Sequence, residues 1–156
     1  MVEEAHEGAA TIVVGIDGSS SSKAALAWAA RQAKLTGETL HLVTTWDYPT
    51  DYGYGWVSAW PENIDFASDA AKGLHDTIKE VLGDDAAITL TETVAEGHPA
   101  PILIDLTEHA ALIVVGSRGH GSFRGMLLGS VSAHVVTHAR CPVVVVHERV
   151  DDSNPA

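Results

Sequence analysis

The sequence predicts an α/β fold in which a five-stranded parallel sheet carries helices on both faces. Short apolar segments rich in valine and isoleucine alternate with longer amphipathic segments along the 156-residue chain. This alternation is typical of βαβ units, whose parallel strands are buried on both faces and are therefore apolar throughout. The chain is 46% hydrophobic and 19% charged, which is typical of a globular protein, and its length suits one domain.

The first strand and the first helix follow from local patterns. Residues 11–17 form a short, β-branched apolar run, which predicts a buried strand. Four consecutive serines at 19–22 each offer a side chain that can cap a helix N-terminus. We therefore expect a helix over residues 23–34 that ends near Gly37.

The middle of the chain predicts two further strands around a long helix. Residues 39–46 and 87–94 are rich in β-branched and apolar residues, which favours strands. Residues 64–82 have helical periodicity and are followed by Gly83, which favours a helix that stops there.

The last third of the chain completes the βαβ series. Proline suits the first turn of a helix, so Pro99 or Pro101 is expected to open a short helix that runs to about residue 109. The remaining elements are a strand over 111–115, a helix over 130–139 and a fifth strand over 143–146.

Three segments lie outside these elements. The connection after the second strand is rich in tyrosine and tryptophan over residues 46–60. Two interpretations of this aromatic loop stay open: it caps a bound ligand, or it packs against the domain or a second subunit. Residues 1–10 and 149–156 are predicted to be flexible tails, which leaves residues 11–148 as one domain.

Composition excludes several classes of function. The formal charge is -12, from 21 acidic and 9 basic residues, which argues against general binding to nucleic acid or to an anionic membrane. No apolar run is long enough for a transmembrane helix, and the acidic N-terminus does not resemble a signal peptide. The single cysteine, Cys141, excludes an internal disulfide and a multi-cysteine zinc site. We expect a cytoplasmic protein.

Charge is unevenly distributed along the chain. Residues 109–147 contain no aspartate or glutamate, but they include Arg118, Arg124 and Arg140. In so acidic a chain this segment is a candidate anion site. The alternative is that much of the segment is buried and carries no charge for that reason.

Two polar segments are expected to meet at one edge of the sheet. In open α/β sheets, ligands bind at the carboxyl ends of the strands where the strand order reverses. The segment after the first strand includes Gly15 and Asp17, and the segment after the fourth is a glycine-rich run from Gly116 to Gly125. Glycines let backbone N–H groups approach an oxyanion closely, and a helix start at Gly129 would add further donors.

The glycine-rich segment resembles the nucleotide motif of the ATP-binding universal stress proteins. The match is Gly116-x2-Gly119-x9-Gly129-Ser130, and no Walker A motif occurs in the chain. The flanking strands at 113–117 and 141–146 agree with the same family, as does the opening strand and turn. The resemblance covers residues 11–147, which is nearly the whole chain.

The resemblance implies a doubly wound, Rossmann-like sheet with strand order 3-2-1-4-5 that binds ATP between strands one and four. It implies a nucleotide-dependent stress-response regulator, a divalent ion (Mg or Mn) carried on the phosphates, and a homodimer formed by the last strand. The implied ligand contacts are Gly15, Asp17 and Thr45 on the adenosine, Gly116 and Gly119 on the ribose and α-phosphate, and Gly129, Ser130, Val131 and Ser132 on the other phosphates.

Several further residues of the sequence need an interpretation of their own. Many relatives have a histidine where this chain has Thr44. His120 lies in the glycine segment and either touches a phosphate or points to water. His134 and His138 are four residues apart, a spacing that can chelate a metal, but no third ligand is near in sequence. Cys141, at the entry to a buried strand, is interpreted as a small hydrophobic residue.

Two other functions stay open beside ATP-dependent regulation. A slow ATP hydrolase would need a general base, and the acid-free segment supplies no carboxylate beside the phosphates. A dimeric interaction module would bind AMP, cyclic AMP or no nucleotide.

Overall fold

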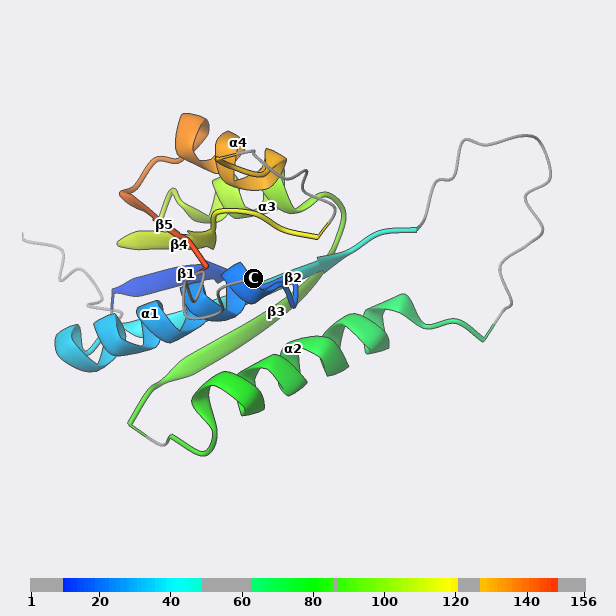
Figure 1. Cartoon of the computed structure of the whole chain (residues 1–156), viewed down its shortest axis with the longest axis horizontal. Coiled ribbons are helices and arrows are strands. Elements are labelled where there is room, and N and C mark those ends of the chain that lie inside the picture. Colours follow the sequence, from blue (N-terminus) through cyan, green and yellow to red (C-terminus); the bar gives the residue numbers. More distant parts are fainter. Residues whose placement is uncertain (1–9, 49–62, 86, 121–126, 149–156) are drawn as a thin grey trace, which may run out of the picture.

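Strands and helices alternate in the order that the sequence predicts (Figure 1). The computed structural model describes residues 10–48, 63–85, 87–120 and 127–148. The elements are β1 (Thr11–Gly15), α1 (Ser20–Thr36), β2 (Thr39–Trp46), α2 (Phe66–Leu82), β3 (Leu90–Glu96), α3 (Pro99–Leu106), β4 (Leu112–Gly116), α4 (Ser130–His138) and β5 (Val143–Val146). Nearly all of the predicted tails, most of the aromatic loop, and Arg124 lie outside the described residues.

The five strands form one parallel sheet in the order β3-β2-β1-β4-β5. The predicted doubly wound fold is therefore confirmed. From β1 the chain winds outward through β2 to β3, and then returns to the other side of β1 to form β4 and β5. The order reverses between β1 and β4, where Val13 pairs with Ile113. This reversal leaves a crevice at the carboxyl ends of these two strands.

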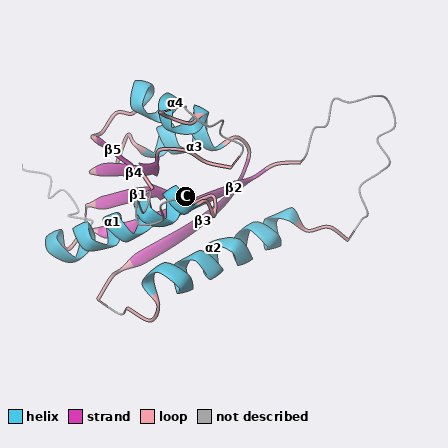
Figure 2. Cartoon of the chain, in the orientation of Figure 1, coloured by secondary structure: helices cyan, strands magenta, loops and turns pink. Residues whose placement is uncertain are grey.

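Two hydrophobic cores lie on opposite faces of the sheet. Alternate residues of a strand point to opposite faces, so Ile12 and Val14 join the core under α1 and α2, whereas Val13 joins the core under α3 and α4. Figure 2 shows these two helix pairs on the two sides of the sheet. Among the described residues, no helix is both long enough and apolar enough to span a membrane.

The start of α1 differs from the prediction. The helix begins at Ser20 rather than at residue 23, because Ser19 is the N-cap and its hydroxyl accepts a hydrogen bond from the Ser22 N–H at 3.3 Å. The other three serines therefore lie inside the first turn. The C-terminal end follows the prediction more closely, since Gly37 adopts a left-handed conformation with φ of 77° after Thr36.

Other boundaries shift by a few residues. The third strand starts at Leu90 rather than at residue 87, because Asp85 accepts a hydrogen bond from the Ala87 N–H at 3.1 Å in a turn. The third helix ends at Leu106 rather than near residue 109. Its C-cap, Thr107, donates its hydroxyl proton to the Ile104 carbonyl at 2.5 Å.

Candidate functional site

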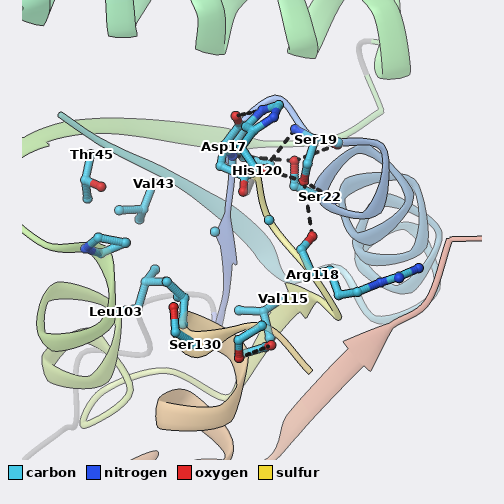
Figure 3. A pocket seen from close by; sticks show the side chains of 18 residues that line it. Asp17, Ser19, Ser22, Val43, Thr45, Leu103, Val115, Arg118, His120 and Ser130 are labelled. Atoms are coloured by element: carbon cyan, nitrogen blue, oxygen red, sulfur yellow. Dashed lines mark hydrogen bonds between the residues drawn. The ribbon is translucent and has the colours of Figure 1, made fainter. Parts of the chain in front are cut away.

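A cavity of about 280 Å³ occupies the crevice between the carboxyl ends of β1 and β4 (Figure 3). Its walls come from β1, β2 and β4, from the starts of α1, α3 and α4, and from the segment after β4. All the residues predicted to form a site lie in its lining: Gly15, Asp17, Thr45, Gly116, Gly119, Gly129, Ser130, Val131 and Ser132. The topology therefore brings together residues up to 117 positions apart, from 15 to 132.

One end of the cavity is apolar. Val43 and Thr45 project from β2, and Leu103 faces them from α3 (Figure 3). Ile16, Pro99 and Val115 also line the cavity. Val43, Leu103 and Val115 are at most 3% exposed, so the slot is fixed by core packing rather than by surface side chains.

The other end is formed by the N-terminus of α4. Gly129 is the N-cap, and among the residues that the structure describes no side chain caps the first turn. The Gly129 N–H donates to the Ser117 carbonyl at 2.7 Å, which fixes the helix start against the end of β4. The first-turn N–H groups of an α-helix have no partner within the helix, so this end can accept an anion.

Two serines in the first turn of α4 differ in their environment. Ser132 is 2% exposed, and its hydroxyl lies 2.9 Å from the Ser117 carbonyl and 3.1 Å from the Gly129 carbonyl, to which it donates. The Ser132 hydroxyl is therefore engaged within the protein, whereas the resemblance implies that Ser132 contacts phosphate. Ser130 is exposed at the cavity and its hydroxyl makes no hydrogen bond to another described residue.

Gly116 is required by the packing of α1. A Cβ atom there would lie 2.7 Å from the Ser21 carbonyl carbon and 2.8 Å from the Ser22 nitrogen. These are backbone atoms, which cannot move aside as the end of a side chain can. The need for glycine at this position thus has a structural cause, separate from the close approach to a ligand that the resemblance implies.

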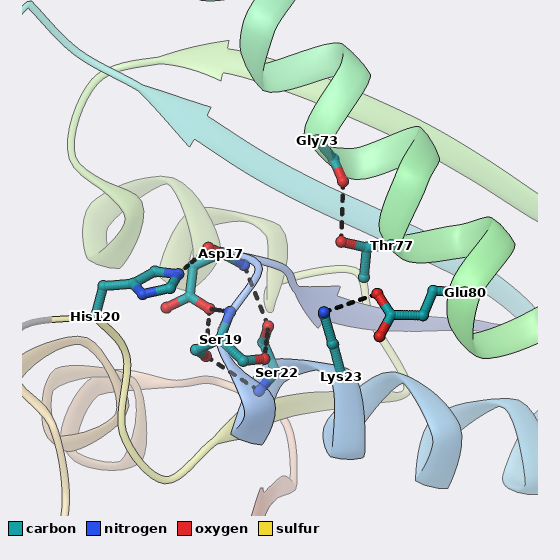
Figure 4. Close-up of polar contacts among 8 residues, drawn as sticks. All are labelled: Asp17, Ser19, Ser22, Lys23, Gly73, Thr77, Glu80 and His120. Carbon is teal, nitrogen blue, oxygen red and sulfur yellow. Dashed lines mark hydrogen bonds and ion pairs between the residues drawn. The ribbon is translucent and has the colours of Figure 1, made fainter.

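Asp17 lies at the cavity mouth with its carboxylate already engaged. Its Oδ1 accepts hydrogen bonds from the Ser19 N–H at 2.9 Å and from the Ser19 hydroxyl at 2.5 Å (Figure 4). A Cβ on Gly119 would lie 2.5 Å from Asp17 Oδ2, so Gly119 packs directly on this carboxylate. Ser19 caps α1 and also orients Asp17.

The basic residues of the acid-free segment take different positions. Arg118 lines the cavity, but Figure 3 shows its guanidinium directed past α1 and away from Ser130. Its main chain is held by Ser21, whose hydroxyl donates to the Arg118 carbonyl. His120 donates from Nε2 to the Asp17 carbonyl at 2.8 Å.

The remaining candidate residues lie outside the cavity lining. His134 and His138 stack on the exposed side of α4, with ring centroids 6.1 Å apart. Over the described ranges, no group of three or more His, Cys, Asp or Glu side chains is arranged to hold a metal ion. Burial raises the pKa of the Cys141 thiol, which keeps it protonated at neutral pH, in agreement with its interpretation as a small hydrophobic residue.

The family model of the universal stress protein family matches residues 9–147. The chain belongs to the universal stress protein family. It is 33% identical to the universal stress protein Rv2005c of Mycobacterium tuberculosis over 143 residues, which cover 87% of this chain and 47% of that protein. The chain thus spans about half the length of the curated relatives it matches.

Solved universal stress proteins share the fold. UspA from Lactobacillus plantarum has a TM-score of 0.72 and 26% identity, covering 88% of this chain and 97% of that chain. A universal stress protein solved in complex with cAMP has a TM-score of 0.64 and 28% identity, covering 90% of this chain and 98% of that chain.

Sequence reasoning missed the apolar side of this universal stress protein site. The sequence patterns do not predict Val43 or Leu103 in the cavity lining, and they predict for Pro99 only that it opens a helix. A signal was present, because Pro99 and Leu103 are four residues apart and share one face of α3. Polar residues after a strand end are recognisable as site candidates. An apolar residue within a strand or helix has the same sequence pattern whether it lines a cavity or packs in the core.

Proposed function

We propose that this chain binds ATP in the crevice between β1 and β4 and acts as a nucleotide-dependent regulatory protein in the stress response. The observation that carries the proposal is the division of one cavity into two chemically different ends. The apolar slot at Val43, Leu103 and Val115 suits a purine base, and the uncapped start of α4 suits phosphates. Asp17 and Thr45 would then lie beside the adenosine.

Cyclic AMP is a second candidate ligand, favoured by one observation. A universal stress protein with 28% identity to this chain was solved in complex with cAMP. The cyclic monophosphate of cAMP needs fewer hydrogen-bond donors than the triphosphate of ATP does. The first-turn N–H groups of α4 support the longer phosphate chain, because Ser130, Val131 and Ser132 all line the cavity. The Gly129 N–H is not among these donors, since it is bonded to the Ser117 carbonyl.

We propose that a divalent ion, Mg²⁺ or Mn²⁺, is carried on the phosphates of ATP. Such ions keep several waters and are commonly bound through substrate phosphates together with one or two carboxylates. Within the part of the chain that the structure describes, the one carboxylate in the cavity lining is Asp17. This residue would contribute at most one ligand, so the phosphates would hold the ion.

Hydrolysis of bound ATP is expected to be slow at most. Efficient hydrolysis needs a base that positions water beside the γ-phosphate. Asp17 already accepts two hydrogen bonds from Ser19 on one oxygen, and Figure 3 shows Asp17 and Ser130 on opposite sides of the cavity. ATP would therefore act as a retained signal rather than as a consumed substrate.

The direct test begins with the purified protein. The protein is denatured and any released nucleotide is identified by chromatography. A nucleotide-free sample is then titrated in a calorimeter with ATP, ADP, AMP and cyclic AMP, with and without Mg²⁺. Preference for ATP over AMP supports the phosphate end at α4, preference for cyclic AMP favours the second ligand, and no heat with any of the four contradicts nucleotide binding.

We also propose that β5 forms a homodimer by pairing with β5 of a second copy. This strand is at the edge of the sheet, and each of its four valines is partly exposed. The Pro142 carbonyl accepts a hydrogen bond from Ile113 in β4, and the Val146 carbonyl accepts one from Ser117, directly after β4. By alternation, the backbone groups of Val143 and Val145 face outward. An unpaired apolar edge is prone to pair with another strand.

Substitution of an outward-facing residue tests the dimer. Proline has no N–H to donate and is tolerated at sheet edges, so Val145→Pro is expected to give a monomer while the pairing with β4 remains. The mass is measured by light scattering after size-exclusion chromatography, and the fold by circular dichroism. A folded dimer of the variant, or a monomeric parent protein, would contradict the proposal.

A further inference from the structure

We propose that His120 is a positioning residue of the nucleotide site, which holds Asp17 in place across the crevice. The inference rests on the proposed function and names a residue that acts on the ligand through its hold on Asp17. His120 belongs to the segment after β4, and Asp17 belongs to the turn between β1 and α1. The two residues come from opposite rims of the cavity, and both line it.

The contact between the two rims has a defined direction. His120 Nε2 lies 2.8 Å from the main-chain carbonyl oxygen of Asp17 (Figure 4). A carbonyl oxygen only accepts hydrogen bonds, so the imidazole carries its proton on Nε2 and donates it. The bond joins residues 103 positions apart in the chain, so it is a long-range tertiary contact rather than part of a local turn.

The surroundings of the imidazole are shaped for this contact. Gly18, directly after Asp17, has φ of 79°, and a Cβ there would lie 3.7 Å from His120 Nε2. The left-handed backbone at Gly18 favours glycine, and it lies directly beside the ring. Gly119 lies against the Asp17 carboxylate, so two consecutive residues after β4 contact the main chain and the side chain of Asp17.

A second hydrogen bond joins the same two rims, deeper in the protein interior. Ser21 donates its hydroxyl proton to the Arg118 carbonyl, and Ser21 is only 4% exposed. His120 is exposed at the mouth, so its tie contributes little to the core. We infer that Ser21 joins the two segments as part of the fold, whereas His120 determines the position of Asp17 at the cavity entrance.

This arrangement predicts which part of the ligand depends on His120. Asp17 and Ser130 lie on opposite sides of the cavity (Figure 3), so loss of the His120 tie displaces the adenosine end and leaves the start of α4 unchanged. Binding of the nucleoside should weaken, and binding of a bare polyphosphate should not. A residue that touched phosphate directly would show the opposite pattern.

The experiment compares three ligands on three variants by calorimetry. The ligands are ATP, adenosine and inorganic tripolyphosphate. For His120→Ala we expect affinities for ATP and adenosine to fall about three- to tenfold, as for loss of one neutral hydrogen bond, with tripolyphosphate unchanged. His120→Gln can place an amide N–H near the same carbonyl and should recover most of the loss. His109→Ala is the matched control, because this exposed histidine precedes β4, at the opposite end of that strand.

The outcomes separate this inference from the proposed function. A parent protein that binds none of the ligands overturns both. A parent protein that binds ATP, with His120→Ala binding it equally well or losing tripolyphosphate in the same proportion, overturns the role of His120 alone. Nitrogen NMR of the ligand-free protein above neutral pH is a further check, since a His120 ring protonated on Nδ1 rather than on Nε2 would also overturn it.

Discussion

Two helices begin at the same cavity, and their first turns are arranged in opposite ways. The helix α1 follows Gly18 and starts with Ser19, whose own hydroxyl accepts the Ser22 N–H. The helix α4 starts with Gly129, which has no side chain to offer, and no side chain elsewhere in the described part of the chain caps its first turn. Both starts are rich in serine, so composition alone does not distinguish them.

The arrangement of each first turn decides which helix start is available to a ligand. At α1 the Ser22 N–H is satisfied by the Ser19 hydroxyl, and Asp17 places a carboxylate beside the cap through its hydrogen bonds with Ser19. A negative charge near a helix N-terminus repels a second anion. At α4 the buried Ser132 donates its hydroxyl proton inward, and the first-turn residues Ser130 and Val131 line the cavity, where their backbone N–H groups can meet a ligand.

The largest effect is expected when α4 is given a side-chain cap that also carries a negative charge. In Gly129→Asp the new carboxylate can accept the first-turn N–H groups and carries a charge of its own. The backbone at Gly129 has φ of −72° and ψ of 170°, which suits any residue. We expect the affinity for ATP, measured by calorimetry, to fall on the order of a hundredfold, or about 3 kcal/mol.

A neutral cap provides the control for this substitution. Gly129→Ser offers an acceptor without a charge, so it should lose less affinity than Gly129→Asp. Equal losses would indicate that the added atoms, rather than the charge, block the site. Unchanged affinity in both variants would contradict an anion site at the start of α4.

The next effect concerns stability and acts through α1. Gly116→Ala places a methyl group against backbone atoms of Ser21 and Ser22, which must shift together with the helix start. We expect a loss of about 2 kcal/mol of unfolding free energy, comparable to other overpacked sites. Thermal unfolding followed by circular dichroism should show a melting temperature lower by roughly 4–8 °C. An unchanged melting temperature would show that the helix yields freely, and Gly73→Ala, with open space around its Cβ position, is the control.

Much of the fold was predictable because local patterns and the sheet agree. The fifth strand matches its predicted range, and the end of α1 follows from Gly37. The start of α1 was mispredicted because four adjacent serines are equally able to cap a helix. Only tertiary contacts choose among them, and here Ser21 is held at Arg118, which places Ser19 rather than Ser22 at the cap.

The sequence predicted which residues gather in one place, but not their individual roles. The glycine spacing pointed to segments that border one cavity, and the nine residues implied by the resemblance line it. It did not reveal that Gly116 serves the packing of α1 or that Ser132 donates inward. These roles depend on which backbone atoms lie opposite across the sheet, and such distances have no signature in the spacing of residues along the chain.

A smaller effect is expected when α1 loses its cap. Ser19→Ala removes the acceptor for the Ser22 N–H and also the hydroxyl that donates to Asp17. We expect a loss of about 1 kcal/mol of unfolding free energy, measured by chemical denaturation. The binding of tripolyphosphate should not change, because the anion donors belong to α4. If tripolyphosphate binding weakens as much as stability does, the two helix starts are not separate in function.

The smallest effects distinguish the two serines within α4. The Ser130 hydroxyl is exposed at the cavity, so Ser130→Ala should weaken ATP binding about threefold and leave stability unchanged. The Ser132 hydroxyl donates to two carbonyls that also accept the Gly129 and Ala133 N–H groups, so neither carbonyl is left unpaired in Ser132→Ala. Its cost should therefore be modest, about 0.7 kcal/mol of unfolding free energy, with ATP affinity retained. Calorimetric titration measures the ATP affinity of both variants, and chemical denaturation measures their stability. A loss of ATP affinity in Ser132→Ala alone would mean that the buried hydroxyl turns toward the ligand.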